Sequence, residues 1–391
     1  MGNSRLSTKK KIVFFAFAIL FGLSLGLIVA EVGLRIAGPA WLRQFMIGTN
    51  LYGQIHYGSD AGWPVESLGG KFVRFKPDKQ FNVEYYEYNT TIHTDRWGGR
   101  RIPDVKKGDG LPIVPVLGDS FTFGLGVNDG ETFVNLMCKK FNAVYLNLGA
   151  PGSALPNQLD IVEFRHKDLG SPPLYIFVFY LGNDFSDMIK YYEDSKNDES
   201  QNSADMRFIE NSKLIQRSYL AQFLLHYVSD QSDSKGKHKT RYYRTPDGKR
   251  ISNSVYLLMA HSKAYSEEVE NVLNRSLDHL EDLSKKLHFR PEIIIIPDKR
   301  QADPYHFNKQ ASVLGLSPDT LDRSFPDRFL QENLEKRGIP YLDLMACLKD
   351  RSGMYYKIDD HFTPAGHRAV ADCIQHAGNL NLPGLQFADK K

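Results

Sequence analysis

The hydrophobic residues of the chain form one long unbroken run near the N-terminus and many shorter runs after it. The long run covers residues 12–30, IVFFAFAILFGLSLGLIVA, which carry no charge and only Ser24 as a polar side chain. A helix of roughly 19 residues that rises about 1.5 Å per residue spans a hydrocarbon core of about 30 Å. The run therefore predicts a transmembrane signal anchor.

The charges that flank this run predict its orientation. Arg5 and the three lysines at 9–11 precede it, whereas Glu31 and Arg35 follow it. Because positive flanks stay on the cytoplasmic side, we expect residues 1–11 to be cytoplasmic and the C-terminal bulk to lie outside the cytoplasm. Two alternatives stay open. One is a cleaved signal peptide, whose apolar part usually has about 7–15 residues before a small-x-small site. The other is a buried core helix.

Residues 41–107 are rich in Gly, Tyr and Phe and show a partial alternation of apolar and polar positions. The segment FVRFKPDKQFNVEYYEYN within this range has the period of two that is typical of strands. We expect a small β-rich extension here, made of short strands joined by turns.

From residue 112 to residue 378, short apolar runs alternate with segments of helical periodicity. Strands are expected at PIVPVL, NAVYLNL, LYIFVFYL, EIIII and IPYLDL. Helices are expected at 156–167, at 255–288, after Thr363 with Pro364 in the first turn, and at ETFVNLMCKKF, with Phe133, Leu136, Met137 and Phe141 on one face. This order, with a third strand that is almost wholly apolar, predicts an α/β domain with a parallel sheet covered on both faces.

Residues 190–250 interrupt that alternation with a polar stretch. Its first part is acidic and its later part is basic. We expect a solvated, partly disordered insertion in the α/β domain. The alternative is a lid, or a basic surface that faces anionic lipid or glycan.

The composition of the 391 residues excludes several classes of protein. A hydrophobic share of 42% supplies a large core and excludes a disordered or collagen-like chain. The 49 basic and 46 acidic residues nearly balance, so we expect no nucleic-acid partner. Three widely spaced cysteines, Cys138, Cys347 and Cys373, exclude a disulfide scaffold and a cysteine-rich metal site. A single disulfide between Cys347 and Cys373 stays open.

The segment GDSFTFG, residues 118–124, contains a candidate nucleophile. Ser120 follows an apolar strand and precedes a helix, so its hydroxyl and its backbone N–H both point into the space at the edge of the sheet. This geometry suits a nucleophile whose own amide helps to bind an oxyanion. The alternative is an N-cap serine in a glycine-rich turn. The Gly-x-Ser-x-Gly elbow is absent, and no Gly-Lys-Ser/Thr follows to support a phosphate loop.

Two further strand ends carry candidate oxyanion donors. Gly152, in NLGAPGS, has no Cβ and would let its backbone N–H approach a ligand closely. Asn183, in GND after the third strand, could donate from its side-chain amide. Taken alone, Gly152 is better explained as a turn glycine without a function, and the alternative for Asn183 is an Asx-turn or a helix cap at the strand end.

The candidate base lies near the C-terminus, in DDHFTP. His361 would accept the serine proton, and Asp359 would orient the imidazole and stabilise its charged form. Asp360 is the other carboxylate that could serve. A metal site formed by His361, Asp359 and His367 is an alternative, although no His-x-x-x-His pair supports it.

Together these segments resemble the SGNH hydrolases, also called the GDSL family. The matching residues, in the same chain order, are Ser120, Gly152, Asn183 and the pair Asp359 and His361. The resemblance implies a flavodoxin-like three-layer α/β/α fold over residues 112–378 and a covalent acyl-enzyme that needs no metal or other cofactor. It also implies that Ser120 is the nucleophile, that His361 is the base, and that Asp359 orients the base. The oxyanion hole would then consist of Ser120, Gly152 and Asn183.

The sequence departs from the family pattern at one functional position. The family usually shows Asp-x-x-His, but Ile358 stands at that place, so the spacing is Asp-x-His. We expect a membrane-anchored extracytoplasmic esterase for acyl or acetyl esters, with a cell-envelope glycan or lipid as a candidate substrate. The alternatives are an O-acyltransferase that modifies an envelope glycan and a non-catalytic glycan-binding scaffold.

Overall fold

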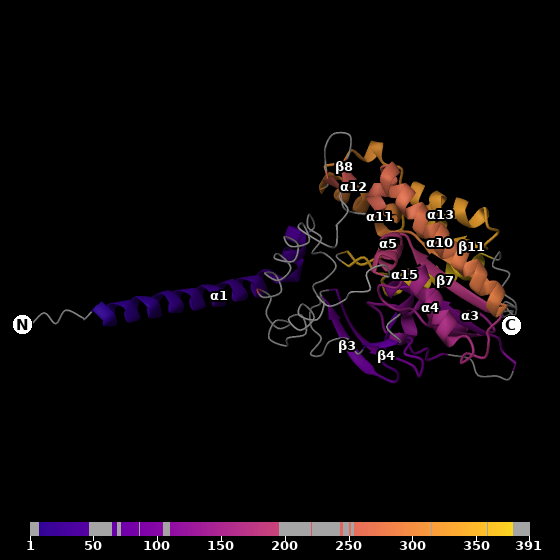
Figure 1. Ribbon diagram of the computed structural model, residues 1–391, viewed down its shortest axis with the longest axis horizontal. Helices are drawn as coiled ribbons and strands as arrows, with labels where there is room; N and C mark the ends of the chain where they lie inside the picture. The colour runs from indigo at the N-terminus through magenta and orange to yellow at the C-terminus, as the bar shows by residue number, and fades with distance from the viewer. Residues whose placement is uncertain are drawn as a thin grey trace, which may run out of the picture. The chain divides into compact units, whose positions relative to one another are not determined.

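The computed structural model describes residues 8–46, 65–68, 72–85, 87–104, 110–194, 220, 243–244, 250–251, 254–313, 315–357 and 359–377 (Figure 1). The chain divides into two compact units. One consists of Met1–Ile55 and Ser200–Thr240, and the other of His56–Glu199 and Arg241–Lys391. Most of the predicted insertion, 190–250, and residues 1–7 of the predicted cytoplasmic segment lie outside the described residues.

The second unit is built around a five-stranded parallel sheet. Its strands are β5 (Ile113–Leu117), β6 (Val144–Asn147), β7 (Leu174–Tyr180), β10 (Arg290–Ile296) and β11 (Tyr341–Asp343), in the spatial order β11-β10-β7-β5-β6. This is the 2-1-3-4-5 order of flavodoxin-like folds, in which the chain reverses direction across the sheet between its first and third strands. The predicted parallel sheet is therefore confirmed, and the switch point lies between β5 and β7.

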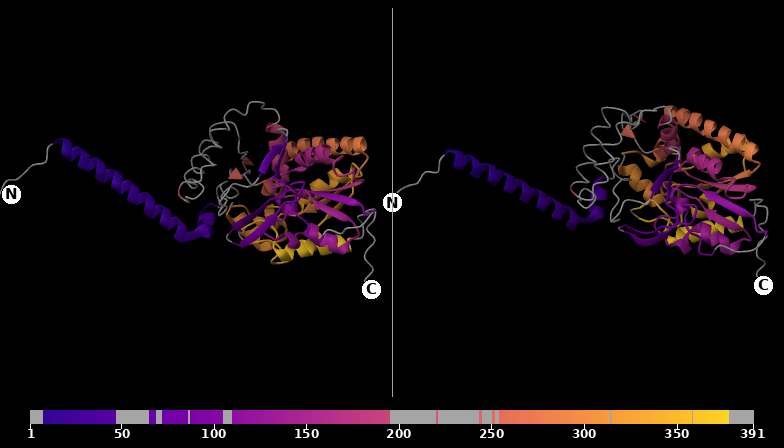
Figure 2. Two further views of the ribbon diagram at one scale, coloured as in Figure 1. Left: turned by 90° about the horizontal axis from the view of Figure 1, so that it is seen from below. Right: turned by 60° about the horizontal axis from the view of Figure 1, so that its bottom comes forward.

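Side chains of β7 alternate between two hydrophobic cores. Tyr175, Phe177 and Phe179 contribute to the first core, whereas Ile176 and Val178 contribute to the second. The first core is covered by α4 (Leu155–Arg165), α5 (Asp184–Asp194), α9 (Ser254–Met259), α10 (Lys263–Leu287) and α13 (Phe325–Glu335). The second is covered by α3 (Phe133–Lys140), α14 (Met345–Leu348) and α15 (Pro364–His376). Figure 2 shows α10 and α15 on opposite sides of the strands, which confirms the predicted three layers.

One detail of the predicted helices was wrong. The helix expected over 255–288 is divided into α9 and α10, because the chain turns at His261, whose φ is 52°. The predicted apolar face of α3 is confirmed, since Phe133, Met137 and Phe141 are buried in the second core and Leu136 packs against it. Val134 and Cys138 are buried in the same core.

Several short elements complete the second unit without contributing to the sheet. The loop after β10 contains α11 (Lys299–Ala302), α12 (Pro304–Val313) and the 3-10 turn η4 (Pro318–Thr320). A second 3-10 turn, η2 (Asp129–Glu131), precedes α3. Strands β8 (Tyr243–Arg244) and β9 (Arg250–Ile251) pair antiparallel.

The range predicted to be a β-rich extension contains two antiparallel pairs. One pair is β1 (Val65–Leu68) with β2 (Phe72–Phe75), and the other is β3 (Gln80–Tyr85) with β4 (Tyr88–His93). A small core holds this region against the segment that follows β5. It consists of the buried side chains Phe75, Ile92, Phe123 and Leu125. The β3–β4 hairpin is thereby fixed beside the strand end that carries the candidate nucleophile.

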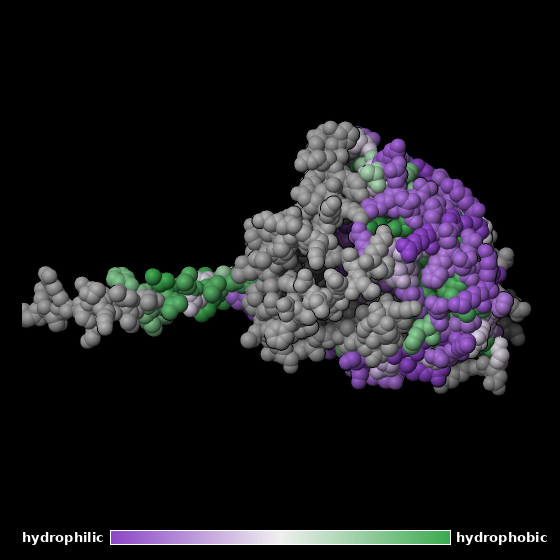
Figure 3. Space-filling view, in the orientation of Figure 1, coloured by the Kyte–Doolittle hydropathy of each residue, from purple (hydrophilic) through white to green (hydrophobic). Residues whose placement is uncertain are grey.

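Within the described residues, the first unit contains the long helix α1 (Thr8–Met46). The part that is long and apolar enough to cross a membrane is Phe17–Ile36, so it begins and ends later than the predicted 12–30. It continues past Glu31 to Arg35, and these two side chains pair across one helical turn at 2.7 Å. Its apolar side chains are exposed (Figure 3), which agrees with a membrane anchor or a signal sequence and not with a core helix.

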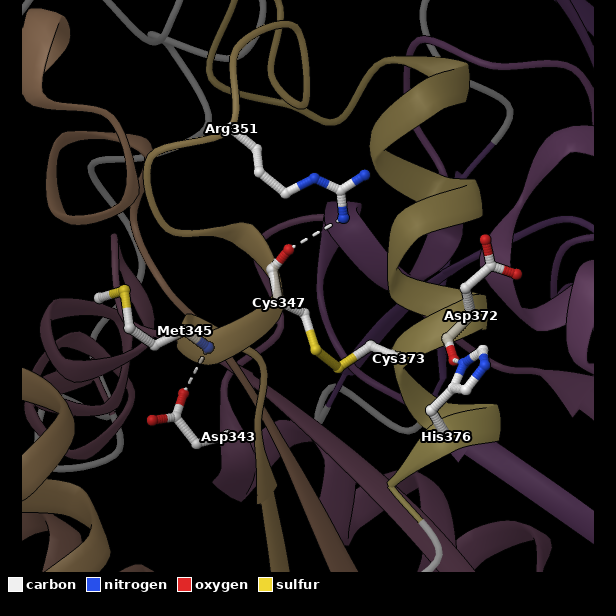
Figure 4. The surroundings of a disulfide bond; sticks show 7 residues. All are labelled: Asp343, Met345, Cys347, Arg351, Asp372, Cys373 and His376. Carbon is white, nitrogen blue, oxygen red and sulfur yellow. Dashed lines mark hydrogen bonds between the residues drawn. A yellow bond between two sulfur atoms is a disulfide. The ribbon is translucent and has the colours of Figure 1, made fainter.

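A disulfide joins two helices on the α15 side of the sheet (Figure 4). It links Cys347 of α14 to Cys373 of α15, and their Cα atoms lie 6.1 Å apart. The sequence allowed this bond but could not establish it. The third cysteine, Cys138, is buried in α3 and is not part of a disulfide.

Candidate active site

Ser120 lies at the carboxyl end of β5 as the first residue of α2 (Ser120–Phe123). The Asp119 carboxylate caps this short helix by accepting the Phe121 N–H at 2.9 Å. Gly118 has no room for a side chain, because a Cβ there would lie 2.9 Å from the Val178 Cβ and would collide with the Thr122 side chain. Gly124 ends the helix in the left-handed region, with φ 83°. The GDSFTFG sequence thus determines the position of Ser120 largely through its own neighbours.

The candidate nucleophile, base and orienting carboxylate form a continuous chain of hydrogen bonds. Ser120 Oγ lies 2.7 Å from His361 Nε2, and His361 Nδ1 lies 2.6 Å from Asp359 Oδ1. Since an ionised carboxylate only accepts, Nδ1 donates to it and Nε2 is left to accept the serine proton. The His361 backbone N–H also donates to Asp359 Oδ1, at 3.0 Å. The side chains that sequence reasoning assigned to a triad are therefore in contact, although 241 positions separate Ser120 from His361.

The pKa values of this pair shift in opposite directions. Burial would lower the pKa of His361, but the Asp359 charge and hydrogen bond outweigh burial and raise it. Burial would raise the pKa of Asp359, but His361 and the hydrogen bonds to Asp359 hold it well below its usual range. Asp359 is therefore ionised and stabilises a charged imidazole.

Asp360, the other candidate carboxylate, points into a different ion-pair network. Its Oδ1 lies 2.9 Å from Lys299 Nζ and its Oδ2 lies 3.3 Å from Arg300 Nη2. Burial would raise the pKa of Asp360, but these two cations lower it to about 2. The geometry therefore favours Asp359 as the partner of His361, and Asp360 stabilises the loop.

The candidate oxyanion donors lie at strand ends on the same edge of the sheet. Gly152 follows β6 with φ 74°, and a Cβ added there would meet nothing within 4 Å. In the described part of the chain, neither the Ser120 N–H nor the Gly152 N–H donates to another protein group. Asn183 follows β7, and its Nδ2 donates to Asp187 Oδ2 at 2.9 Å, which leaves its second N–H for a ligand. Their joint role as an oxyanion hole stays a prediction.

The structure does not assemble the alternative metal site. His367 is fully buried in α15, and its Nδ1 accepts the Phe133 N–H at 3.2 Å. Burial lowers the pKa of His367 to about 3, so the ring is neutral. Among the described residues, no group of three or more His, Cys, Asp or Glu side chains is arranged to hold a metal ion.

Three residues that sequence reasoning missed contact the base loop. Tyr88 and Glu87, at the tip of the β3–β4 hairpin, reach the side chain and the backbone of Asp359. Lys299, from the loop after β10, donates to the carbonyl oxygens of Tyr356, Lys357 and Asp359 at 3.1–3.3 Å. No motif marks these residues, because each acts through a contact that only the folded chain creates.

Comparisons with known proteins identify one family model and several solved structures that this chain resembles. Residues 252–390 match the model of the family described as "SGNH hydrolase-like domain, acetyltransferase AlgX"; this range contains Asp359 and His361 but not Ser120. No curated protein matched the sequence.

Solved structures that resemble the chain include a member of the lipolytic protein G-D-S-L family from Veillonella parvula. It is 12% identical, with 68% of this chain and 99% of that chain covered and a TM-score of 0.36. Another is a lipase/acylhydrolase from Enterococcus faecalis, with 13% identity, 71% and 100% coverage and a TM-score of 0.34. A third is an acetylxylan esterase from Geobacillus stearothermophilus, with 11% identity, 72% and 99% coverage and a TM-score of 0.31. Residues 252–390 therefore match an SGNH hydrolase-like domain, and the motifs and the sheet order of the second unit resemble that family.

Proposed function

We propose that the protein is a membrane-anchored, extracytoplasmic serine hydrolase that cleaves acyl or acetyl esters. The observation that carries this proposal is the hydrogen-bonded chain from Ser120 through His361 to Asp359. A non-catalytic glycan-binding scaffold has no need of this arrangement, in which a buried carboxylate, an imidazole and a hydroxyl are aligned at 2.6–2.7 Å.

The reaction would proceed in two halves through an acyl-enzyme. Ser120 Oγ attacks the ester carbonyl carbon while its proton passes to His361 Nε2, and the resulting imidazolium is stabilised by Asp359. The negative carbonyl oxygen would be held by the N–H groups of Ser120 and Gly152 and by the Asn183 amide. The alkoxide then leaves with the proton from His361, and Ser120 keeps the acyl group. Water attacks this ester in the second half, gives its proton to His361, and releases the acid and the serine.

O-acetyl transfer to a cell-envelope glycan is the second candidate, and the family that residues 252–390 match supports it by its name. The same acyl-enzyme would form, but a glycan hydroxyl would replace water in the second half. No residue of the triad differs between the two reactions, so the acceptor site decides between them.

The anchoring part of the proposal rests on α1. Its exposed apolar span, with the basic residues before it, favours an N-terminus in the cytoplasm and a catalytic unit outside. The Cys347–Cys373 disulfide supports an oxidising compartment, since such bonds rarely persist in the cytosol. Protease treatment of intact spheroplasts that express the full chain should digest the catalytic unit; protection of that unit until lysis would contradict this orientation.

Activity is tested with the full chain in detergent and p-nitrophenyl acetate. The wild type should release p-nitrophenol, and Ser120→Ala should reduce kcat to the background rate. Equal rates for the two proteins would remove the enzyme proposal. A second assay would mix an acetylated donor with a non-acetylated glycan and follow both by mass spectrometry. Acetate release without glycan acetylation identifies an esterase, whereas acetylated glycan identifies a transferase.

A further inference from the structure

Two adjacent residues at the tip of the β3–β4 hairpin contact the loop that carries the candidate base. The Tyr88 hydroxyl donates to Asp359 Oδ2 at 2.7 Å. The Glu87 carboxylate accepts the Lys357 N–H at 2.8 Å and the Asp359 N–H at 2.7 Å. These contacts join positions about 270 residues apart, between the extension and the hydrolase domain.

Every polar part of Asp359 is engaged as a result. Its Oδ1 accepts from the ring and the backbone of His361, and its Oδ2 accepts from Tyr88. Its backbone N–H donates to Glu87, and its carbonyl oxygen accepts from Lys299 Nζ at 3.1 Å. The carboxylate therefore cannot rotate about its bond to Cβ without losing a hydrogen bond on one of its two oxygens.

The hairpin tip is itself held against the segment that follows the nucleophile. The Tyr88 ring packs on the Tyr356 ring with centroids 5.0 Å apart, and the Tyr356 hydroxyl donates to the Gly126 carbonyl at 2.7 Å. Gly126 has φ 88°, and a Cβ there would lie 2.8 Å from the Tyr356 ring and 3.2 Å from the Tyr88 ring. Glycine at position 126 thus permits both rings to approach the backbone. This packing holds the Tyr88 ring, and with it the hydroxyl that donates to Asp359.

We infer that Tyr88 and Glu87 are positioning residues for Asp359, and that the β3–β4 hairpin is thereby part of the catalytic machinery. This inference rests on the proposed hydrolase function. Tyr88 fixes the rotation of the carboxylate, and Glu87 fixes the backbone from which it projects. Neither residue would touch the substrate; both act by keeping Asp359 Oδ1 aligned with His361 Nδ1.

The first test is Tyr88→Phe in the full chain, which removes one hydroxyl and keeps the ring. We expect kcat for p-nitrophenyl acetate to fall about 10- to 100-fold with KM unchanged, which is the scale of one hydrogen bond to a charged group. The rise of kcat/KM with pH should also move to lower pH, because a displaced carboxylate stabilises the imidazolium less. An unchanged pH profile would mean that Tyr88 only packs against its neighbours. A move to higher pH would mean that its hydroxyl only lowers the basicity of the Asp359 carboxylate and does not orient it. Either result overturns the inference.

A double-mutant cycle isolates the route through Asp359. If Tyr88 acts only on that carboxylate, Tyr88→Phe should have no further effect on kcat in the Asp359→Asn background. Equal losses in both backgrounds would overturn the inference. Tyr341→Phe is the matched control. Tyr341 is the first residue of the edge strand β11, and its hydroxyl donates to the Glu335 carboxylate at 2.6 Å, so this variant removes another hydrogen bond from a tyrosine to a carboxylate. We expect this control to keep the wild-type kcat and pH profile.

Glu87→Gln tests the backbone contact separately. An amide oxygen can accept from one of the two N–H groups, whereas the amide nitrogen cannot accept from the other. We expect a loss of kcat that again disappears in the Asp359→Asn background, and persistence of the loss there would contradict the assignment. A wild type with Ser120-dependent turnover and an unaffected Tyr88→Phe variant would refute this inference alone. A wild type without such turnover would refute the proposed function.

Discussion

The two halves of the candidate site are held in place by different means. Ser120 is positioned by residues within a few positions of itself: Asp119 caps its helix, and Gly118 and Gly124 allow the tight turn on either side. The loop with Asp359 and His361 has local hydrogen bonds as well, such as the Tyr356 N–H to the His361 carbonyl oxygen at 3.0 Å, but these are not its whole support. It depends on side chains from the β3–β4 hairpin and from the loop after β10. A short motif can therefore encode the nucleophile, whereas the base needs the complete fold.

The largest expected loss of kcat distinguishes the two adjacent carboxylates of the base loop, Asp359 and Asp360. Asp359→Asn should lower kcat on the order of 10⁴-fold, because the imidazole loses the partner that fixes its tautomer. Asp360→Asn should leave kcat within a few-fold and lower the melting temperature, since the buried Lys299 and Arg300 side chains lose a partly buried charged partner. Kinetics and thermal unfolding of both variants provide the measurement. A larger loss of kcat in Asp360→Asn would reverse the assignment.

The two carboxylates also show which features of the site could be predicted from the sequence and which could not. The parallel sheet, its strands and the approach of Ser120 to His361 could be predicted, because apolar runs and strand-end motifs are local signals. The choice between Asp359 and Asp360 could not be made, because it depends on Lys299 and Arg300 folding beneath the loop. The turn at His261 that divides α9 from α10 was not predicted either, and the contact of Tyr88 with Asp359 was invisible because only the folded chain creates it.

On the nucleophile side, Asn183→Ala should lower kcat by about 10²- to 10³-fold with a smaller change in KM, because it removes a donor to the developing oxyanion. Asp187→Asn tests the neighbour that holds the Asn183 amide at 2.9 Å, and it should cost less. Steady-state kinetics measures both. A change confined to KM in Asn183→Ala would assign that amide to substrate binding and remove it from the oxyanion hole.

The pH dependence tests the electrostatics of the base side. His361 must be neutral to accept the serine proton, and its pKa is raised above the ordinary value of about 6.5 by Asp359. The kcat/KM value should therefore fall as the pH decreases through a point above about 6.5. In Asp359→Asn that point should move to lower pH, because burial then acts without the compensating charge. An acid limb below 6.5 in the wild type would contradict the pairing.

The smallest effect on activity is expected from the disulfide. Replacing Cys347 and Cys373 together by serine should lower the free energy of unfolding by about 3 kcal/mol, since the bond closes a loop across 26 positions. The kcat value should change little, because Cys373 lies in the last turn of α15, whereas His361 precedes the first turn of that helix. Cys138→Ser is the control for the loss of a buried thiol. Equal denaturant stability of the double variant and the wild type would show that the bond contributes nothing.

Mass spectrometry of the acid-quenched full chain after brief mixing with p-nitrophenyl acetate tests most directly whether Ser120 is the nucleophile. We predict one added acetyl group on the peptide that contains Ser120, and its absence in Ser120→Ala. Release of p-nitrophenol with the acetyl group on another residue, or with an equal adduct in Ser120→Ala, would contradict the acyl-enzyme mechanism.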